Sequence, residues 1–471
     1  MQHGLFTKDA SMGTEEPTPV VIPVHCAPKK SPCPECGKHG RRKRKITRRV
    51  RTVAYKAVAY LEITCGEYQA RCDCCTTFRN TPEQVLPRAL YDNKVRDLVL
   101  ERVLEDGMSI ERTLASLRRE FLLELSTGFV YDVLHDHARQ LDMAEHRRKV
   151  LGLFSGTLCI DELHLGRSTL LLATDPLSGL PVAFALVDKN DQGHMRRFLN
   201  NLAIWGLNPK VVVTDGSNLY PAVLAEVWPD ADHQLCVFYV IKDINELILD
   251  AVRRLRTAMG RRGKAGRKKR RGRKGAKSKA TAARRGLTVK EKANFVFKHR
   301  HLIVKRQGNL TESERDDLKQ MLEYLPELRA LRRFADRIYW MFDAAKDFHQ
   351  ASCRRATVVR DPAFGEVPEL VKAMEQLDEE KFPKLMAYLK NPVSRRVRTN
   401  NHVERTNRMF RLLEKVRYKW RRRRTLVRFV VLTLDGIWRE HAAAQAKAAD
   451  RSMPTGPDKT EGEMRKRRRA A

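Results

Sequence analysis

The sequence contains no apolar run that reaches the roughly 18 residues of a membrane-spanning helix, no internal repeat and no secretory signal. Acids are scarce relative to bases: 57 Asp and Glu stand against 92 Lys and Arg, which gives a net charge of +35. These absences argue against a membrane protein, a solenoid and a secreted, disulfide-bonded protein. They favour a cytoplasmic chain with a polyanionic partner such as DNA.

The basic residues are densest in residues 261–285, which contain 14 Lys or Arg and no acid. Removing these 14 charges from +35 leaves +21, so the basicity extends over the whole chain. The tract is of low complexity, and we expect it to be disordered until it meets phosphate. A solubilising or nonspecific role stands beside a specific role in end binding. The N-terminal arm (1–29) and the basic tail (443–471) are expected to be disordered as well.

Apolar periodicity between residues 155 and 240 predicts a mixed α/β sheet. The first three runs are short and rich in apolar residues, which indicates an antiparallel meander. The fourth, KVVVT, is uninterrupted and is typical of a strand buried on both faces. The expected order is β-β-β-α-β-α-β, with strands at 157–164, 168–174, 181–187, 210–214 and 233–238 and helices at 193–205 and 218–227.

Three acids stand at positions suited to metal-dependent chemistry. Asp161 lies in the first strand, Asp215 ends the fourth, and Glu404 follows much later in a segment of helix formers. Chemistry in open α/β sheets gathers at the carboxyl ends of strands, and Mg²⁺ prefers oxygen ligands. Glu162 is a weaker candidate because strand alternation directs it to the opposite face. Glu414 is about 15 Å further along the helix than Glu404, so one ion cannot use both.

Cysteine spacing gives a second strong signal. The pattern Cys-x-x-Cys occurs twice, with strand-like sequence between the pairs, as in a structural zinc ribbon. The expected ligands are Cys33, Cys36, Cys72 and Cys75. Cys74 is an alternative to Cys75, and Cys26 or His25 are weaker substitutes.

The acids and cysteines together resemble those of DDE-class transposases of bacterial insertion sequences that carry an N-terminal zinc ribbon, and their mutator-like relatives. The resemblance covers roughly residues 30–440 and implies an RNase H-like catalytic core with a helical insertion before the catalytic Glu. It makes Asp161, Asp215 and Glu404 the ligands of Mg²⁺ or Mn²⁺. Many relatives have a Cys-x-x-His pair after the fifth strand, where this chain has Cys236 and Tyr239.

Residues 90–142 predict three amphipathic helices, with Ser109 and Ser126 as N-caps. This pattern favours a helix-turn-helix module whose last helix reads DNA, although a plain packing module remains an alternative. A basic loop is expected on the ribbon between its cysteine pairs. The residues expected to contact DNA are Arg41, Arg42, Lys43, Arg44, Thr127, Tyr131, His135, Arg398 and Arg408.

The predicted domain order is zinc ribbon (30–85), helical DNA-binding module (90–142), first part of the RNase H-like core (155–240), helical insertion (241–395), and catalytic and C-terminal helices (396–442). Within the insertion, residues 318–348 have a strongly helical pattern. Trp340 and Phe342 are expected in its core.

These features predict a DNA transposase that binds the ends of its insertion sequence and catalyses Mg²⁺-dependent cleavage and strand transfer. The resemblance implies a homodimer or larger assembly on element ends and target DNA, in the bacterial nucleoid. Two alternatives stay open. One is a catalytically inactive zinc-ribbon regulator derived from a transposase, and the other is an RNase H-like nuclease.

Overall fold

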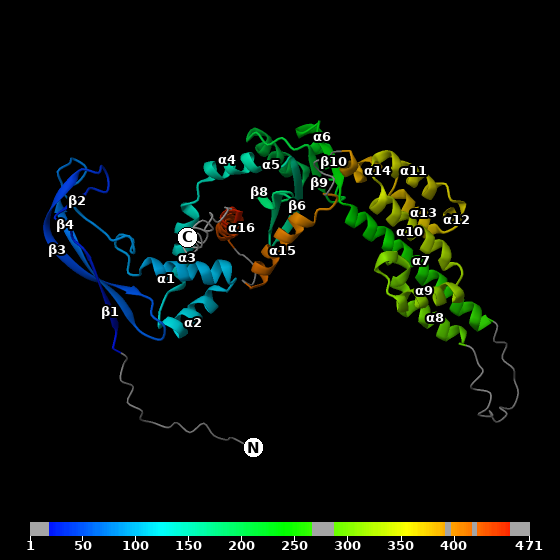
Figure 1. The fold of residues 1–471 in the computed structure, drawn as a ribbon, viewed down its shortest axis with the longest axis horizontal. Coiled ribbons are helices and arrows are strands. Elements are labelled where there is room, and N and C mark those ends of the chain that lie inside the picture. The colour runs from blue at the N-terminus through cyan, green and yellow to red at the C-terminus, as the bar shows by residue number, and fades with distance from the viewer. Residues whose placement is uncertain (1–17, 266–286, 391–396, 417–421, 453–471) are drawn as a thin grey trace, which may run out of the picture. The chain divides into compact units, whose positions relative to one another are not determined.

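The computed structural model describes residues 18–265, 287–390, 397–416 and 422–452 (Figure 1). The chain divides into two compact units, Met1–Met143 with Met409–Ala471, and Ala144–Arg408. Most of the basic tract and the ends of the predicted arm and tail lie outside the described residues. No helix in the described part is long and apolar enough to cross a membrane.

A five-stranded sheet opens the first unit. Its strands are β1 (Val20–Cys26), β2 (Lys30–Pro32), β3 (His39–Thr52), β4 (Ala59–Gln69) and β5 (Thr77–Arg79). The path is β1-β4-β3-β2, β5 also pairs with β4, and β1 runs parallel to β4. Two expectations were wrong. The end of the predicted disordered arm forms β1, because Val24 and Cys26 pack against a core around Ile63. The basic segment forms β3 rather than a loop, because it pairs with β4 along its length.

Three helices follow the sheet. They are α1 (Asn93–Leu100), extended by a π-helical turn (Glu101–Glu105), α2 (Ile110–Phe121) and α3 (Thr127–Arg139). Ser109 and Ser126 cap α2 and α3 as predicted, each accepting a bond from the backbone N–H three residues on. Phe429 and Leu432 of α16 (Arg423–Ser452) are buried in the same core. Helix α16 extends past residue 443, where disorder was expected, because its Ala-rich sequence favours helix.

The second sheet lies in the other unit, after helix α4 (Met143–Leu153). Its strands are β6 (Thr157–Leu165), β7 (Ser168–Asp175), β8 (Leu180–Val187), β9 (Val211–Thr214) and β10 (Asp232–Leu235), in the order β10-β9-β6-β7-β8. The predicted antiparallel meander is confirmed in β6–β8, and β9 and β10 run parallel to β6. Helices α5 (Gln192–Ile204) and α6 (Pro221–Val227) connect the later strands.

A helical bundle follows β10 (Figure 1). Its helices are α7 (Val237–Ala265), α8 (Val289–Lys298), α9 (Glu312–Tyr324), α10 (Leu328–Ala344), α11 (Phe348–Val359), α12 (Pro362–Gly365), α13 (Pro368–Glu375) and α14 (Lys381–Leu385). One apolar core joins them, with Phe334 and Phe342 fully buried on α10. Phe342 is in the core as expected, whereas the expectation for Trp340 was wrong, since this side chain is 49% exposed. The chain then enters α15 (Asn401–Val416).

Candidate functional site

Two of the predicted acids come from adjacent parallel strands: Asp161 lies within β6, and Asp215 directly follows β9. Cys159 of β6 pairs with Val213 of β9. Continuing this register by two residues brings Asp161 opposite Asp215, which directly follows β9. Adjacent strands are about 4.8 Å apart, and residues in register on parallel strands point to the same face. The two carboxylates are therefore expected on one face, and the charge of Asp215 does raise the pKa of Asp161.

The third acid comes from α15, which is tied to β6 by two asparagines. Asn400 is fully buried, and its Nδ2 donates to the carbonyl oxygen of Ile160 at 2.9 Å. Asn407 lies one turn beyond Glu404, and its Nδ2 donates to Oδ2 of Asp161 at 2.8 Å. These bonds fix the first turn of α15 beside β6 (Figure 1). Glu404 lies in that turn and its charge acts on Asp215, although the two acids are distant in sequence.

The carboxylates affect one another electrostatically. Burial, with the nearby charges of Glu162 and Asp215, raises the pKa of Asp161 to about 7. Burial also raises the pKa of Asp215, and the charge of Glu404 adds to that shift. Repulsion among neighbouring carboxylates disfavours their ionised forms. A bound cation would stabilise those ionised forms.

Tyr239, in the first turn of α7, contacts this cluster. Its hydroxyl shares a hydrogen bond with Glu404, and its pKa is raised by burial and by that bond. Tyr239 therefore touches the third acid. Oε1 of Glu404 is buried and has no hydrogen-bond partner among the described residues. A buried carboxylate oxygen without a donor is costly unless a cation or water meets it.

Glu162 has partners that account for its burial. It accepts hydrogen bonds from the hydroxyl of Tyr220 and, at 3.4 Å, from Nδ2 of Asn190. Its pKa is raised by burial, and the bond to Tyr220 opposes that shift. Glu162 is thus a hydrogen-bonded neighbour of the cluster, and its charge raises the pKa of Asp161.

The donor set fits a hard divalent cation. Asp161, Asp215 and Glu404 offer carboxylate oxygens, the ligand type that Mg²⁺ and Mn²⁺ prefer. The unpartnered oxygen of Glu404 and the raised pKa values of both aspartates fit the same occupant. Among the described residues, the carboxylate oxygens of these three acids do not all lie within 4.8 Å of one another.

Cysteine thiols form such a compact group in the N-terminal sheet. One turn, between β2 and β3, carries Cys33 and Cys36, and the other, between β4 and β5, carries Cys72 and Cys74. The four sulfur atoms of these residues all lie within 4.8 Å of one another. Four thiols at this separation can hold one metal ion, and the arrangement is compatible with a zinc ribbon.

The fourth cysteine of this compact group differs from the first choice made from sequence. The compact set contains Cys74, which had been considered as the alternative to Cys75. Cys75 stays close, with its sulfur 3.8 Å from that of Cys33. Backbone N–H groups of Cys36 and Glu35 lower the pKa of Cys33 to about 7, which favours the thiolate that a metal requires.

The residues expected to contact DNA are placed in several elements. The four basic residues at 41–44 lie on β3, where Arg44 pairs with Glu67 and Arg42 bonds the carbonyl oxygen of Ala27. Thr127 and Tyr131 are exposed on α3, and His135 is half-buried there. Arg408 is exposed on α15. Arg398 bonds the carbonyl oxygen of Phe342 at 2.7 Å and the carboxylate of Asp343 at 3.0 Å, so it is partly engaged.

Sequence reasoning missed two residues of the site and one of its signals. Asn407 and Tyr220 were not singled out, although Asn407 lies three residues after Glu404 and hence on the same helical face. Asp161 and Asp215 are as far apart in sequence as the paired residues Cys159 and Val213. This equal spacing is a sign that the two acids share the register of that pair.

The sheet and its carboxylates define an α/β protein with an acidic site at the carboxyl ends of its strands. A family model described as a transposase, DDE_Tnp_ISL3, matches residues 158–427, which is more than half of the chain. The chain belongs to this transposase family. Membership implies DNA as the partner and a divalent metal as cofactor. No curated protein matches the sequence.

Proposed function

We propose that this chain is a DDE transposase with an RNase H-like core, which binds the ends of its insertion sequence, cleaves DNA and joins the freed end to a target. The proposal is supported by Asp161 on β6 and Asp215 directly after the neighbouring parallel strand β9, and by the hydrogen bonds of Asn400 and Asn407 that tie the helix of Glu404 to β6. The strand order of the second sheet and the family match support it.

The three carboxylates would hold Mg²⁺ or Mn²⁺. When bound, two such ions activate the attacking oxygen and stabilise the charge on the leaving oxygen of an in-line displacement. Asn407 holds the carboxylate of Asp161 in one orientation, and Tyr239 does the same for Glu404. Burial of the cluster strengthens its interaction with positive charge, because the surroundings screen that charge poorly.

The reaction has two displacements at phosphorus. A water oxygen first attacks the phosphodiester at the element end, and the 3′ oxygen leaves as a 3′-hydroxyl. That hydroxyl then attacks a target phosphodiester, and the target strand's 3′ oxygen leaves with the proton. The second step exchanges one phosphodiester for another, so it needs no external energy source.

The remaining domains would position DNA. We assign residues 30–85 to a zinc ribbon and 90–142 to a helix-turn-helix-like module, with Thr127 and Tyr131 on its exposed recognition helix. The residues at 41–44, Arg398 and Arg408 would contact phosphates, which fix position without reading sequence. Two element ends must be held together for joining, so we expect a homodimer or larger assembly.

The test is a joining assay with the full chain. A labelled duplex that carries one end of the element, taken from the DNA flanking the gene, is incubated with Mg²⁺ and a supercoiled plasmid. We expect the labelled 3′ end to become covalently attached to the plasmid. Hydrolysis without attachment would identify a nuclease. Specific binding with neither reaction, in Mg²⁺ and in Mn²⁺, would identify a regulator. Either outcome overturns the proposal.

We expect purified full-length protein to hold about one tightly bound zinc per chain, because four thiolates form a closed tetrahedral site. Cys33→Ser should lose the metal and unfold the N-terminal sheet, since a structural zinc contributes directly to folding. Metal content is measured by mass spectrometry of the desalted protein, and folding by proteolysis of the N-terminal region.

The matched control is Cys353→Ser, which changes an exposed cysteine of α11 and should keep the zinc. The positions of the thiols also give different predictions for the two adjacent cysteines. Cys74→Ser should lose zinc, and Cys75→Ser should retain it. The reverse pattern would make Cys75 the fourth ligand. A metal-free preparation with a protease-resistant N-terminal sheet would refute a structural zinc site.

A further inference from the structure

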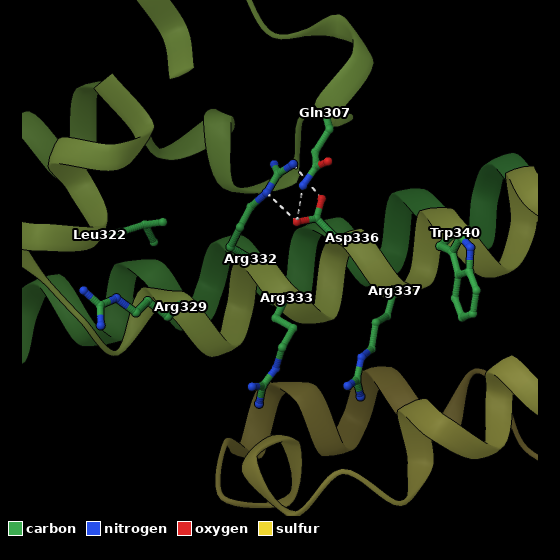
Figure 2. Close-up of a pocket in the computed structure, with 8 residues that line it drawn as sticks. All are labelled: Gln307, Leu322, Arg329, Arg332, Arg333, Asp336, Arg337 and Trp340. Atoms are coloured by element: carbon green, nitrogen blue, oxygen red, sulfur yellow. Dashed lines mark hydrogen bonds and ion pairs between the residues drawn. The ribbon is translucent and has the colours of Figure 1, made fainter. Parts of the chain in front are cut away.

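One face of α10 carries a row of exposed cationic and aromatic side chains. Arg329, Arg333, Arg337 and Trp340 follow one another at spacings of four, four and three residues, which places them along one side of the helix (Figure 2). Successive arginines are therefore about 6 Å apart along the axis. The half-exposed indole of Trp340 ends the row, on a helix whose opposite face is buried in the core.

These residues line an open groove of about 440 Å³, together with Gln307, Leu322, Arg332 and Asp336 (Figure 2). Four of its eight lining residues are arginines, and one is an acid. Such a lining predicts an anionic ligand, provided that the arginines are not already used in the fold.

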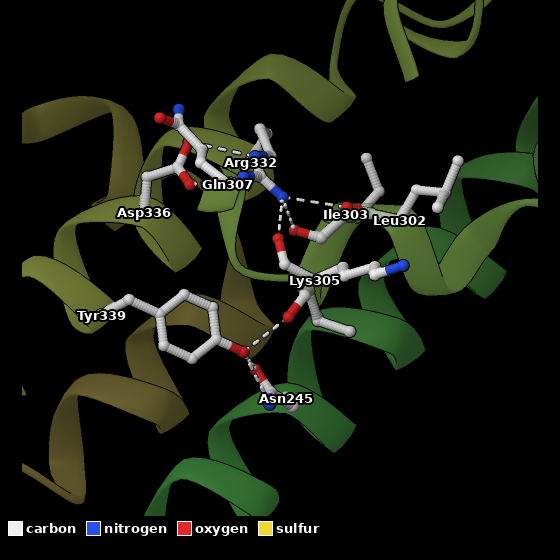
Figure 3. A network of polar contacts seen from close by, with 9 residues as sticks. Asn245, Leu302, Ile303, Lys305, Gln307, Arg332, Asp336 and Tyr339 are labelled. Carbon is white, nitrogen blue, oxygen red and sulfur yellow. Dashed lines mark hydrogen bonds and ion pairs between the residues drawn. The ribbon is translucent and has the colours of Figure 1, made fainter. Parts of the chain in front are cut away.

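Arg332 and Asp336 are used in the fold (Figure 3). Arg332 is buried, and its Nη1 donates to the carbonyl oxygens of Leu302, Ile303 and Lys305 at 2.6–3.2 Å. Its Nε and Nη2 bind both carboxylate oxygens of Asp336. The one acid of the groove is therefore neutralised by an arginine whose three side-chain nitrogens are all hydrogen-bonded within the fold.

The arginines of the row differ in how many of their N–H donors are already bonded within the protein. Arg329 has no ion-pair partner among the described residues. Arg333 lies 3.4 Å from Asp361 and 5.3 Å from the centre of the Phe364 ring, and its side chain is 51% exposed. Arg337 is more engaged, at 2.8 Å from Asp361 and 2.9 Å from the carbonyl oxygen of Thr357. Arg329 and Arg333 thus hold most of their charge and hydrogen-bonding capacity toward solvent.

Trp340 gives the groove a planar surface. The guanidinium of Arg354 lies 3.9 Å from the centre of its ring and donates to its backbone carbonyl at 2.8 Å. An indole fixed in this way and 49% exposed can serve as a platform for a flat ligand, such as a nucleic acid base.

Consecutive residues link the α10 groove to a second groove, which in turn is lined by a neighbour in sequence of Tyr239. Arg306 precedes Gln307 and lines a second groove of about 390 Å³. That groove is lined as well by Phe238 and Arg398, and Phe238 precedes Tyr239, which contacts Glu404. The two grooves of this unit are thus connected through the consecutive residues Arg306 and Gln307.

We propose that the α10 groove binds DNA, with Arg329 and Arg333 on successive phosphates and Trp340 stacked on a base that is exposed where the strands separate. The regularly spaced arginines and the single indole fit the phosphates and bases of a DNA strand. A small anion would use only one or two of the donors. This inference rests on the proposed function, because it takes DNA as the substrate.

The test compares DNA binding by the full chain and the double variant Arg329→Gln/Arg333→Gln, across a salt titration, on duplex and single-stranded DNA. Each lost phosphate contact lowers the slope of log affinity against log salt by about 1, so we expect a reduction of about 2 on duplex. Arg360→Gln is the matched control. It removes an equal charge from an exposed position of the same bundle outside the groove, and it should leave the slope unchanged.

Trp340→Ala should weaken binding of single-stranded DNA by about tenfold and leave duplex affinity nearly unaltered, because only unpaired bases stack on an indole. The inference is overturned if the double variant behaves as Arg360→Gln does, or if Trp340→Ala binds both DNA forms as the parent does. Failure of the proposed function is seen separately, as absence of joining by the parent protein.

Discussion

Asp161→Asn is expected to abolish Mg²⁺-dependent cleavage and joining, by on the order of 10³-fold or more, while DNA-end binding persists. The substitution keeps the volume and the contact with Asn407 but removes the charge that holds a cation. Asp215→Asn and Glu404→Gln should have the same effect, because each removes one carboxylate of the same cluster. The measurement is single-turnover joining of a labelled end, with end binding measured by gel shift.

Glu162→Gln is the matched control for these variants. It changes the neighbouring carboxylate of the same strand, which is held by Tyr220 and Asn190 and lies outside the proposed ligand set. We expect joining within about tenfold of the parent, since no ligand is lost. Joining at the parental rate by Asp161→Asn would remove that residue from the site. An equal loss in both variants would show that general disruption of β6 is the cause.

The largest expected effect on stability comes from Arg332→Leu. The change leaves the carboxylate of Asp336 without its bidentate partner and removes the arginine donor from three backbone carbonyls (Figure 3). Removing one partner of a buried ion pair costs about 3–5 kcal/mol. Hydrogen exchange of the α10 amides should therefore accelerate by more than about a hundredfold, because 1.4 kcal/mol corresponds to a factor of ten.

Arg329→Leu provides the comparison for this prediction. It makes the same replacement one turn away on the same helix, at an exposed position with no ion pair in the described part of the chain. The effect should stay within about 0.5 kcal/mol. Similar exchange rates in the two variants would show that the network around Arg332 adds little to the stability of the bundle.

Local sequence determined the secondary structure of the second sheet and the identity of the candidate acids. Apolar runs and turn residues located β6, β7 and β8 within one or two residues, and Ser109 and Ser126 marked the starts of two helices. These features depend on side-chain periodicity and capping, which act over a few residues and can be read from the chain itself.

Only the tertiary structure decided which distant residues meet. The anchoring of α15 by Asn400 and Asn407, the contact of Tyr239 with Glu404, and the burial of Phe429 in the helical module join segments far apart in the chain. Local patterns do not encode such pairings, because each depends on how whole elements pack.

Exposure likewise followed from packing rather than residue type. Trp340 was expected in the core and lies in a groove, whereas Arg332, a charged residue on the same helix, is buried. A helix buries one face whatever the size of the residues on the other, and a buried arginine is tolerated when all its donors find acceptors. The sequence alone therefore determined the elements and the acidic residue types, and the packing of those elements decided which side chains form sites and which support the fold.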